Sequence, residues 1–212
     1  EDYSVFKEVN KKTNDYSSKT IAILYFENNS NNIELDPLQK GLADMMISDL
    51  SNLNILKVVE REKIEEILNE INLSHSKEFD NKTQQKIGEL LGADLILFGS
   101  YFELMSQFRI DAKIVETETG EIVKSEGVNG LTSDFMKLEK QLVWKIASEL
   151  DVKLKDKTNF VIEKSADYNA VLLFSEGLEF YDSGNKNDAL KKFEAALQIE
   201  PDFKRAKDMI NK

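Results

Sequence analysis

The chain is poor in the residues that most often carry chemistry. It has no cysteine and only one histidine among 212 residues. Without cysteine it cannot form a disulfide, a zinc–thiolate site or a thiol nucleophile. The single histidine, His75, lies in the polar segment SHSKEFD without a second histidine beside it. We therefore expect His75 in a surface loop and not in a metal site or a catalytic triad.

Long apolar runs are also missing, since none approaches the ~18 residues that a membrane helix needs. Acidic residues outnumber basic ones, 39 to 28, which gives a net charge of −11. Such a surface repels phosphate backbones, so nucleic acid is not an expected partner. It also disfavours anionic lipid unless a covalent anchor holds the chain. The simplest interpretation of the acidity is solubility.

What is present is the composition of a globular protein, with 41% hydrophobic and 32% charged residues. Four segments can be distinguished along the chain. We expect a polar N-terminal arm at 1–19, an α/β domain at 20–150, a Lys- and Asp-rich linker at 151–165 and a helical segment at 166–212.

Hydrophobic periodicity within 20–150 predicts an α/β (α+β) fold with a mixed, largely antiparallel sheet flanked by helices. About five strands are expected, at 21–27, 55–59, 95–104, 108–115 and 121–130. Four helices are expected, at 37–50, 60–71, 82–91 and 133–150, with a polar connection at 72–80. Asp36 is predicted to cap the first helix, with Pro37 in its first position. Gly92 and Gly120 are predicted to end a helix and form a hairpin turn.

Acidic side chains form pairs that could imitate a catalytic acid and base, such as Glu65 with Glu66. These pairs fall on polar helix faces or hairpin ends, so we expect solvated charge there. Glu60-Arg61 opens a helix, and two interpretations of Arg61 remain open. It is either part of a structural cap or a bridge to a neighbouring carboxylate or subunit. No reaction, cofactor or metal site is expected.

The last segment resembles a single tetratricopeptide repeat. The positions that carry the resemblance are Gly177, Phe180, Ala189, Phe193, Ala196 and Pro201. Gly177 and Ala189 would let two helices approach closely, and Phe180 and Phe193 would fill the space between them. The resemblance implies a partner-binding face at Val171, Phe174, Leu178 and Tyr181. The alternative is that these four side chains pack on the α/β domain.

Six short motifs within residues 20–150 together resemble the CsgG-like family of curli-assembly and envelope lipoproteins. They are IAILYF (21–26), GLAD (41–44), VER (59–61), IGELLGAD (87–94), FGS (98–100) and TGE (119–121). The resemblance implies a non-enzymatic α/β domain in the periplasm, often lipid-anchored at the outer membrane. Its pore-forming members assemble rings of identical subunits and add long amphipathic hairpins that cross the membrane. This sequence has no such insertions after Gly99 or near 125–131.

The expected function is therefore an assembly or adaptor module for secretion or surface structures, without the transmembrane hairpins. Expected partners are proteins, including further copies of the chain. Membrane contact is expected only through a lipid anchor upstream of Glu1. The alternative is a peptide-binding tetratricopeptide adaptor for which the α/β domain is a platform.

Overall fold

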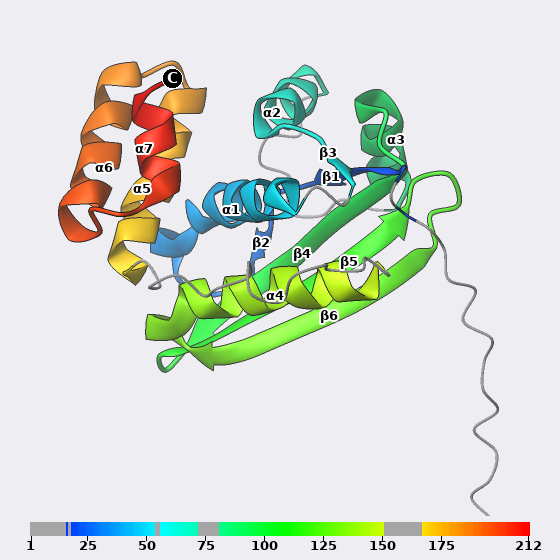
Figure 1. Ribbon diagram of the computed structural model, residues 1–212, viewed down its shortest axis with the longest axis horizontal. Coiled ribbons are helices and arrows are strands. Elements are labelled where there is room, and N and C mark those ends of the chain that lie inside the picture. Colours follow the sequence, from blue (N-terminus) through cyan, green and yellow to red (C-terminus); the bar gives the residue numbers. More distant parts are fainter. Residues whose placement is uncertain (1–15, 17, 54–55, 72–80, 151–166) are drawn as a thin grey trace, which may run out of the picture.

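The computed structural model describes residues 16, 18–53, 56–71, 81–150 and 167–212 (Figure 1). The strands in this part of the chain are β1 (Thr20–Ile23), β2 (Glu27–Asn28), β3 (Lys57–Val58), β4 (Leu95–Leu104), β5 (Gln107–Glu116) and β6 (Ile122–Leu131). The α-helices are α1 (Leu38–Asn52), α2 (Arg61–Glu70), α3 (Asn81–Leu91), α4 (Phe135–Glu149), α5 (Tyr168–Asp182), α6 (Lys186–Ile199) and α7 (Lys204–Ile210). Two short 3₁₀ helices, η1 (Ile33–Leu35) and η2 (Thr132–Asp134), precede α1 and α4.

The strands form one mixed sheet in the order β3-β1-β4-β5-β6, and β2 pairs with β4 beyond the end of β1. The short strands β1, β2 and β3 run in parallel with their neighbours. The three long strands β4, β5 and β6 form an antiparallel meander. This architecture confirms the predicted fold class.

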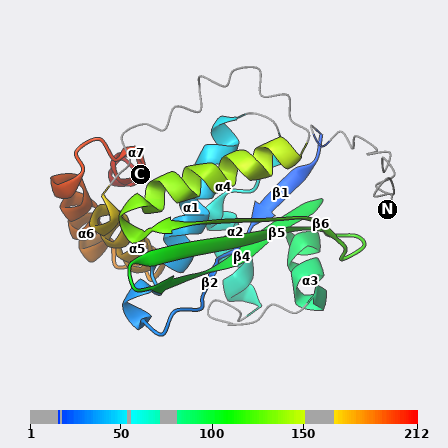
Figure 2. The same cartoon turned by 90° about the horizontal axis from the view of Figure 1, so that it is seen from below.

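Helices lie on both faces of the sheet (Figure 2). On one face α4 runs along the meander, and the ring of Phe108 meets that of Phe135 edge-on at 5.0 Å. On the other face α3 packs where Gly88 approaches Ile96 of β4. Side chains alternate along a strand, so Phe108 and Ile110 point to the α4 face and Arg109 to the other.

The first predicted strand, 21–27, is divided in two. The amide of Leu24 still donates to the carbonyl of Leu97 at 2.8 Å, but that of Phe26 donates to the carbonyl of Gln39 at 3.3 Å. Because Phe26 bonds to α1 instead of a strand, the ladder is interrupted and resumes as β2. The sheet therefore has six strands in the described residues, where the sequence predicted about five.

The predicted start of the first helix is wrong by a short distance. Asp36 does not cap α1; it ends η1, and its side chain accepts a hydrogen bond from the Asn28 amide at 2.8 Å. Pro37 is the residue that precedes α1, and it has no side chain able to cap. The two turn glycines are confirmed, since φ is 64° at Gly92 and 71° at Gly120.

Residues 167–212, called the tail below, form three helices against one end of the sheet layer. A Cβ on Gly177 would lie 2.5 Å from the Phe193 ring, which confirms the predicted close approach of α5 and α6. Phe174 packs on Phe193 and Phe203, with ring centroids at 5.7 and 5.0 Å. The polar arm up to residue 15, the connection that holds His75 and the linker lie outside the described residues.

Candidate functional site: the contact between the tail and α1

The tail contacts the α/β layer where α5 crosses α1. The crossing point is Gly41, where a Cβ would lie 1.8 Å from Ser175 Oγ and 2.8 Å from Ser175 Cβ. The Ser175 hydroxyl donates to the carbonyl of Val171 at 2.7 Å, so its orientation is fixed. Any side chain at position 41 would force the two helices apart.

This contact determines where the four predicted partner-binding residues lie. Val171, Phe174 and Leu178 are fully buried, and Tyr181 is half-buried against the same core. Phe174 packs on Phe193 and Phe203 of the tail itself, so packing on the α/β domain, the alternative left open by the sequence, does not describe this residue. A role for Val171, Phe174 and Leu178 in binding another protein stays a prediction, and it would require α5 to separate from its neighbours.

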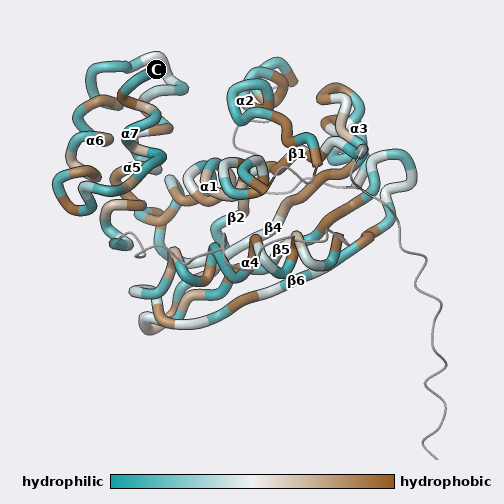
Figure 3. The backbone as a smooth tube through the Cα atoms, viewed as in Figure 1, coloured by the Kyte–Doolittle hydropathy of each residue, from teal (hydrophilic) through white to brown (hydrophobic). Residues whose placement is uncertain are grey.

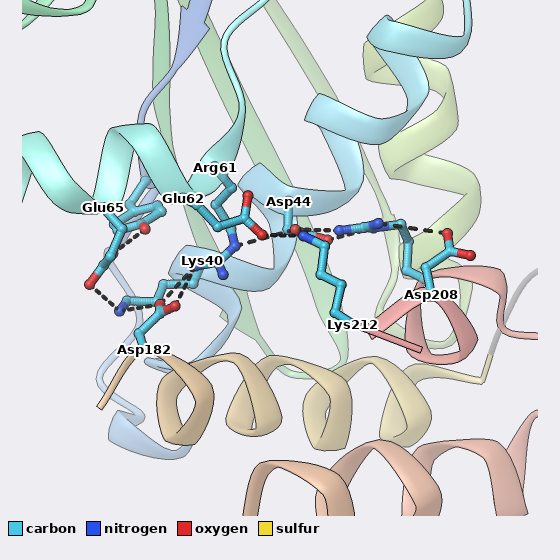
Figure 4. A network of polar contacts seen from close by, with 10 residues as sticks. Lys40, Asp44, Arg61, Glu62, Glu65, Asp182, Asp208 and Lys212 are labelled. Carbon is cyan, nitrogen blue, oxygen red and sulfur yellow. Dashed lines mark hydrogen bonds and ion pairs between the residues drawn. The ribbon is translucent and has the colours of Figure 1, made fainter. Parts of the chain in front are cut away.

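Beside the crossing, charged side chains from four helices form a connected network (Figure 4). We call this network the seam. Its members are Lys40 and Asp44 of α1, Arg61, Glu62 and Glu65 of α2, Asp182 of α5, Arg205 and Asp208 of α7, and Lys212. The seam therefore joins the tail to two helices of the α/β layer.

Arg61 is at the centre of the seam. Its NH1 donates to both oxygens of Asp182, at 2.9 and 2.7 Å, and its Nε lies 3.4 Å from Asp44 Oδ1. Lys40 joins the same carboxylate, with Nζ 2.9 Å from Asp182 Oδ2 and 3.0 Å from Glu65 Oε1. Asp182, at the last position of α5, is thus held by two cations of the α/β layer.

A second arm of the seam ties α7 to α1. Arg205 makes a bidentate contact with Asp44, from Nε at 2.8 Å and NH2 at 2.7 Å. At the rim, Lys212 donates to Glu62. Asp44 therefore receives one arginine from α2 and another from the tail, and planar bidentate pairs of this kind give geometric specificity.

The inner part of the seam is shielded from water. The side chains of Arg61 and Asp44 are each 2% exposed. Burial opposes ionisation of Glu65, but hydrogen bonds from Tyr25 and Lys40 and the charge of Lys40 outweigh it, so the pKa of Glu65 is below its usual value. Burial and the Glu65 charge raise the pKa of Tyr25, so its hydroxyl remains a donor. At neutral pH, Glu65 is thus ionised and accepts a hydrogen bond from the neutral Tyr25.

This arrangement fastens helices to one another through ion pairs, although Nε and NH2 of the central Arg61 make no hydrogen bond. Each seam carboxylate has a cation partner, and no cluster of three His, Asp or Glu in the described residues could hold a metal ion. Of the two interpretations of Arg61, the bridge to a neighbouring carboxylate is the one seen. The expectation that Glu65 is solvated is wrong, since Glu65 is 9% exposed and bonded to Tyr25 and Lys40.

A second buried polar group lies between α1 and α4. Lys140 of α4 forms an ion pair with Asp49 of α1, and its Nζ is 3.5 Å from Glu139 Oε2. Glu139 is fully buried, and neither of its carboxylate oxygens has a hydrogen-bond partner. Burial and the nearby charge of Asp49 raise the pKa of Glu139 well above its usual value. The sequence analysis did not single out this pair.

The sequence model for the curli production assembly/transport component CsgG matches residues 3–107. Over this region the sequence is similar to CsgG. The match begins before the predicted domain start and ends at Gln107, so the motif at 119–121 lies beyond it. Among curated proteins, none matches the chain. The tetratricopeptide resemblance of the tail stays a prediction.

Solved structures that are similar to this chain include the following three. The LpoB C-terminal domain from Salmonella enterica is 15% identical, with a TM-score of 0.45, over 53% of this chain and 82% of that one. Lipoprotein GNA1162 from Neisseria meningitidis is 15% identical, with a TM-score of 0.48, over 64% and 99%. The PelC dodecamer from Paraburkholderia phytofirmans is 14% identical, with a TM-score of 0.41, over 65% and 91%. Because all three TM-scores are below 0.5, we infer no function from these similarities.

Proposed function

We propose that the protein is a non-enzymatic assembly or adaptor protein of the bacterial cell envelope. The observation that carries this proposal is the match of residues 3–107 to the model of a curli assembly and transport component. The proposed location is the periplasm, with a lipid anchor at the outer membrane. Within the described residues, no helix has the length and hydrophobicity to cross a bilayer.

The seam supports an adaptor role for the tail. Its buried ion pairs join α5 and α7 to the α/β layer, which supports a fixed orientation of these two helices. A rigid tail presents its outer helices to a partner without paying the entropy of ordering them on binding. We propose that these outer surfaces, on α6 and α7, contact other envelope components or further copies of the chain.

The alternative function is a peptide-binding tetratricopeptide adaptor that uses the α5 face. Tyr181 is the member of that face which remains half-exposed. A Tyr181→Ser variant separates the two functions. Loss of partner binding with unchanged self-association favours the peptide-binding adaptor, and retention of both favours the outer surfaces of the tail.

Cell fractionation of the full-length protein in its native host tests the proposed location. The expected result is recovery in the envelope fraction, released by detergent and not by high salt. Recovery in the cytosol would contradict the proposal. Light scattering on the purified chain tests self-assembly, because one copy has a mass of 24.3 kDa. If the protein has the mass of one copy at all concentrations, self-assembly is excluded and only contact with other envelope components remains.

A further inference from the structure

One end of the antiparallel meander exposes apolar side chains. Met105 is 88% exposed, Leu104 61%, Leu131 50% and Phe102 39%. These four residues, called the apolar tip below, lie at the β4–β5 turn and the adjacent end of β6, at the lower left of the sheet in Figure 1. The other exposed large apolar side chains of the described residues are spread over η1, α3, the start of β6 and α6; they are Ile33, Leu90, Ile122, Leu190 and Ile199. Figure 3 colours the backbone by the hydropathy of each residue.

Strand register brings the tip residues together. Leu104 pairs with Gln107, and Gln107 pairs with Leu131, so the two leucines lie on the same sheet face two strands apart. Phe102 is two residues before Leu104 and shares that face. The face is the one opposite α4, since Tyr101 and Phe108 occupy the α4 side.

The turn itself has an unusual backbone for its sequence. Met105 has φ 50° and Ser106 has φ 60°, so both central residues of this two-residue turn are in the left-handed region. Glycine, asparagine and aspartate are strongly preferred in such turns. A methionine therefore occupies a position where the backbone conformation is unfavourable for its residue type and where its side chain is exposed. This combination points to a role for the side chain outside the fold.

The turn of the tip is uncharged, whereas the whole chain is acidic; Glu103, between Phe102 and Leu104, is the acidic residue beside the turn. Residues 104–108 have no charged side chain, and the nearest basic residue, Arg109, is paired with Asp111 at 2.6 Å. Glu103 accepts a hydrogen bond from the Thr132 hydroxyl at 3.3 Å. The whole chain has a net charge of −11. An anionic surface would be repelled by the acidic chain, but a zwitterionic lipid surface would not.

We propose that the apolar tip enters the boundary between head groups and acyl chains of a zwitterionic lipid layer. Four side chains on a convex turn are far fewer than the 20–30 residues per partner of a standard protein interface. They suffice for shallow insertion, where binding follows the buried apolar area. The expectation of membrane contact only through a lipid anchor took the overall charge into account, and this charge does not describe the uncharged turn at residues 104–108.

A tryptophan reporter tests the tip directly, because Trp144 is the only tryptophan. In a Trp144→Phe background, Met105→Trp places a single reporter at the turn. We expect its emission to shift to the blue on titration with phosphatidylcholine vesicles, and less when a third of the lipid is phosphatidylglycerol. Adding Leu104→Ser and Leu131→Ser should weaken binding about tenfold or more, since each removes apolar area from the insertion.

Leu190→Trp in the same background is the matched control, since Leu190 of α6 is 40% exposed and belongs to the tail. Its emission should not change with lipid. An unchanged reporter at position 105 at millimolar lipid, or equal shifts at 105 and 190, would overturn the proposal. So would a blue shift at 105 that appears without lipid as protein concentration rises, because this indicates contact between copies. If the tip fails the vesicle test but the full-length protein is still recovered in the envelope fraction, the tip proposal is overturned and the proposed function stands.

Discussion

Helix α1 carries two acidic residues, five positions apart, in opposite situations. Asp44 faces the tail and receives two arginines, Arg61 and Arg205. Asp49 faces α4, where a single cation, Lys140, is shared with a second carboxyl group, that of Glu139. At the first site two cations share one carboxylate, although each arginine also pairs with a second acidic residue, and at the second site one cation lies between two carboxyl groups. The two positions on one helix therefore depend on charge in different ways.

The comparison teaches what buried charge does at each contact. In the seam, the ionised form of Glu65 is stabilised, and its pKa is lowered accordingly. At the α1–α4 contact, burial and the charge of Asp49 raise the pKa of Glu139, so the protonated form is favoured. The contact of Glu65 with Lys40 and Tyr25 should therefore weaken in acid, whereas the α1–α4 contact should improve there.

The largest expected effect comes from Arg61→Ala, which breaks the seam at its centre. Removing one partner of a buried ion pair costs about 3–5 kcal/mol, and we expect about 3 because Lys40 and Arg205 remain beside the two carboxylates. Denaturant unfolding measures the loss. Limited proteolysis should also show earlier cleavage around the tail.

The double variant Arg61→Met/Asp182→Leu sharpens this prediction. Replacing both partners by apolar groups removes the unpaired charge, so it should cost less than Arg61→Ala alone. If the single variant is as stable as the wild type, the seam does not hold the tail in solution.

The next effect is steric. Gly41→Ala places a methyl group against Ser175 and should cost about 1–3 kcal/mol through overpacking, although alanine is the better helix former. Ser175→Gly by itself should cost about 1 kcal/mol from helix propensity. The double variant should be more stable than the sum of the two single effects predicts, because the clash is gone. Strict additivity in unfolding experiments would show that the helices do not meet at Gly41.

Glu139→Gln is expected to stabilise the protein at neutral pH. The folded-state pKa of Glu139 is above its unfolded value, so its contribution is favourable at low pH and is lost as pH rises through the folded-state pKa. Glutamine has no charge to bury, and we expect a gain of about 1–3 kcal/mol at pH 7. The advantage over wild type should vanish at about pH 4 and below, where the wild-type glutamate is protonated. A constant difference across this range in chemical unfolding would refute the assignment.

The smallest effect belongs to the rim of the seam. Lys212 and Glu62 are 43% and 39% exposed, and the pKa of Glu62 is lowered by the Lys212 hydrogen bond despite partial burial. Lys212→Ala should cost about 0.5 kcal/mol or less, because water screens such pairs. The loss should shrink further in 1 M salt. A loss as large as that of Arg61→Ala would mean that rim and centre act as one unit.

Local sequence patterns predicted most of the fold. Periodicity located the long helices and the β4–β6 meander, and glycine chemistry located the turns at Gly92 and Gly120. The break after Ile23 was missed because it depends on a hydrogen bond from Phe26 to α1, a contact made in three dimensions.

The seam could be predicted only in part. The bridging role was one of two interpretations of Arg61, but its partner Asp182 is 121 positions away, and no local pattern joins them. One feature of the sequence does indicate a buried charge in α1: Asp44 lies among apolar neighbours in LADMM. A charge in such a run needs a buried partner. Glu65 was wrongly predicted to be solvated because its sequence neighbours are polar, whereas its side chain faces Lys40.

The close approach at Gly41 also has a practical consequence for protein engineering. The tail fits its site on α1 partly because Gly41 has no side chain there. Introducing the charged residues of the seam into another α/β scaffold would therefore not be enough to bind the tail. A recipient helix would need a glycine one position after the lysine and three before the aspartate, as in KGLAD. In a fusion without this glycine, we expect the three helices of the tail not to pack on the recipient scaffold.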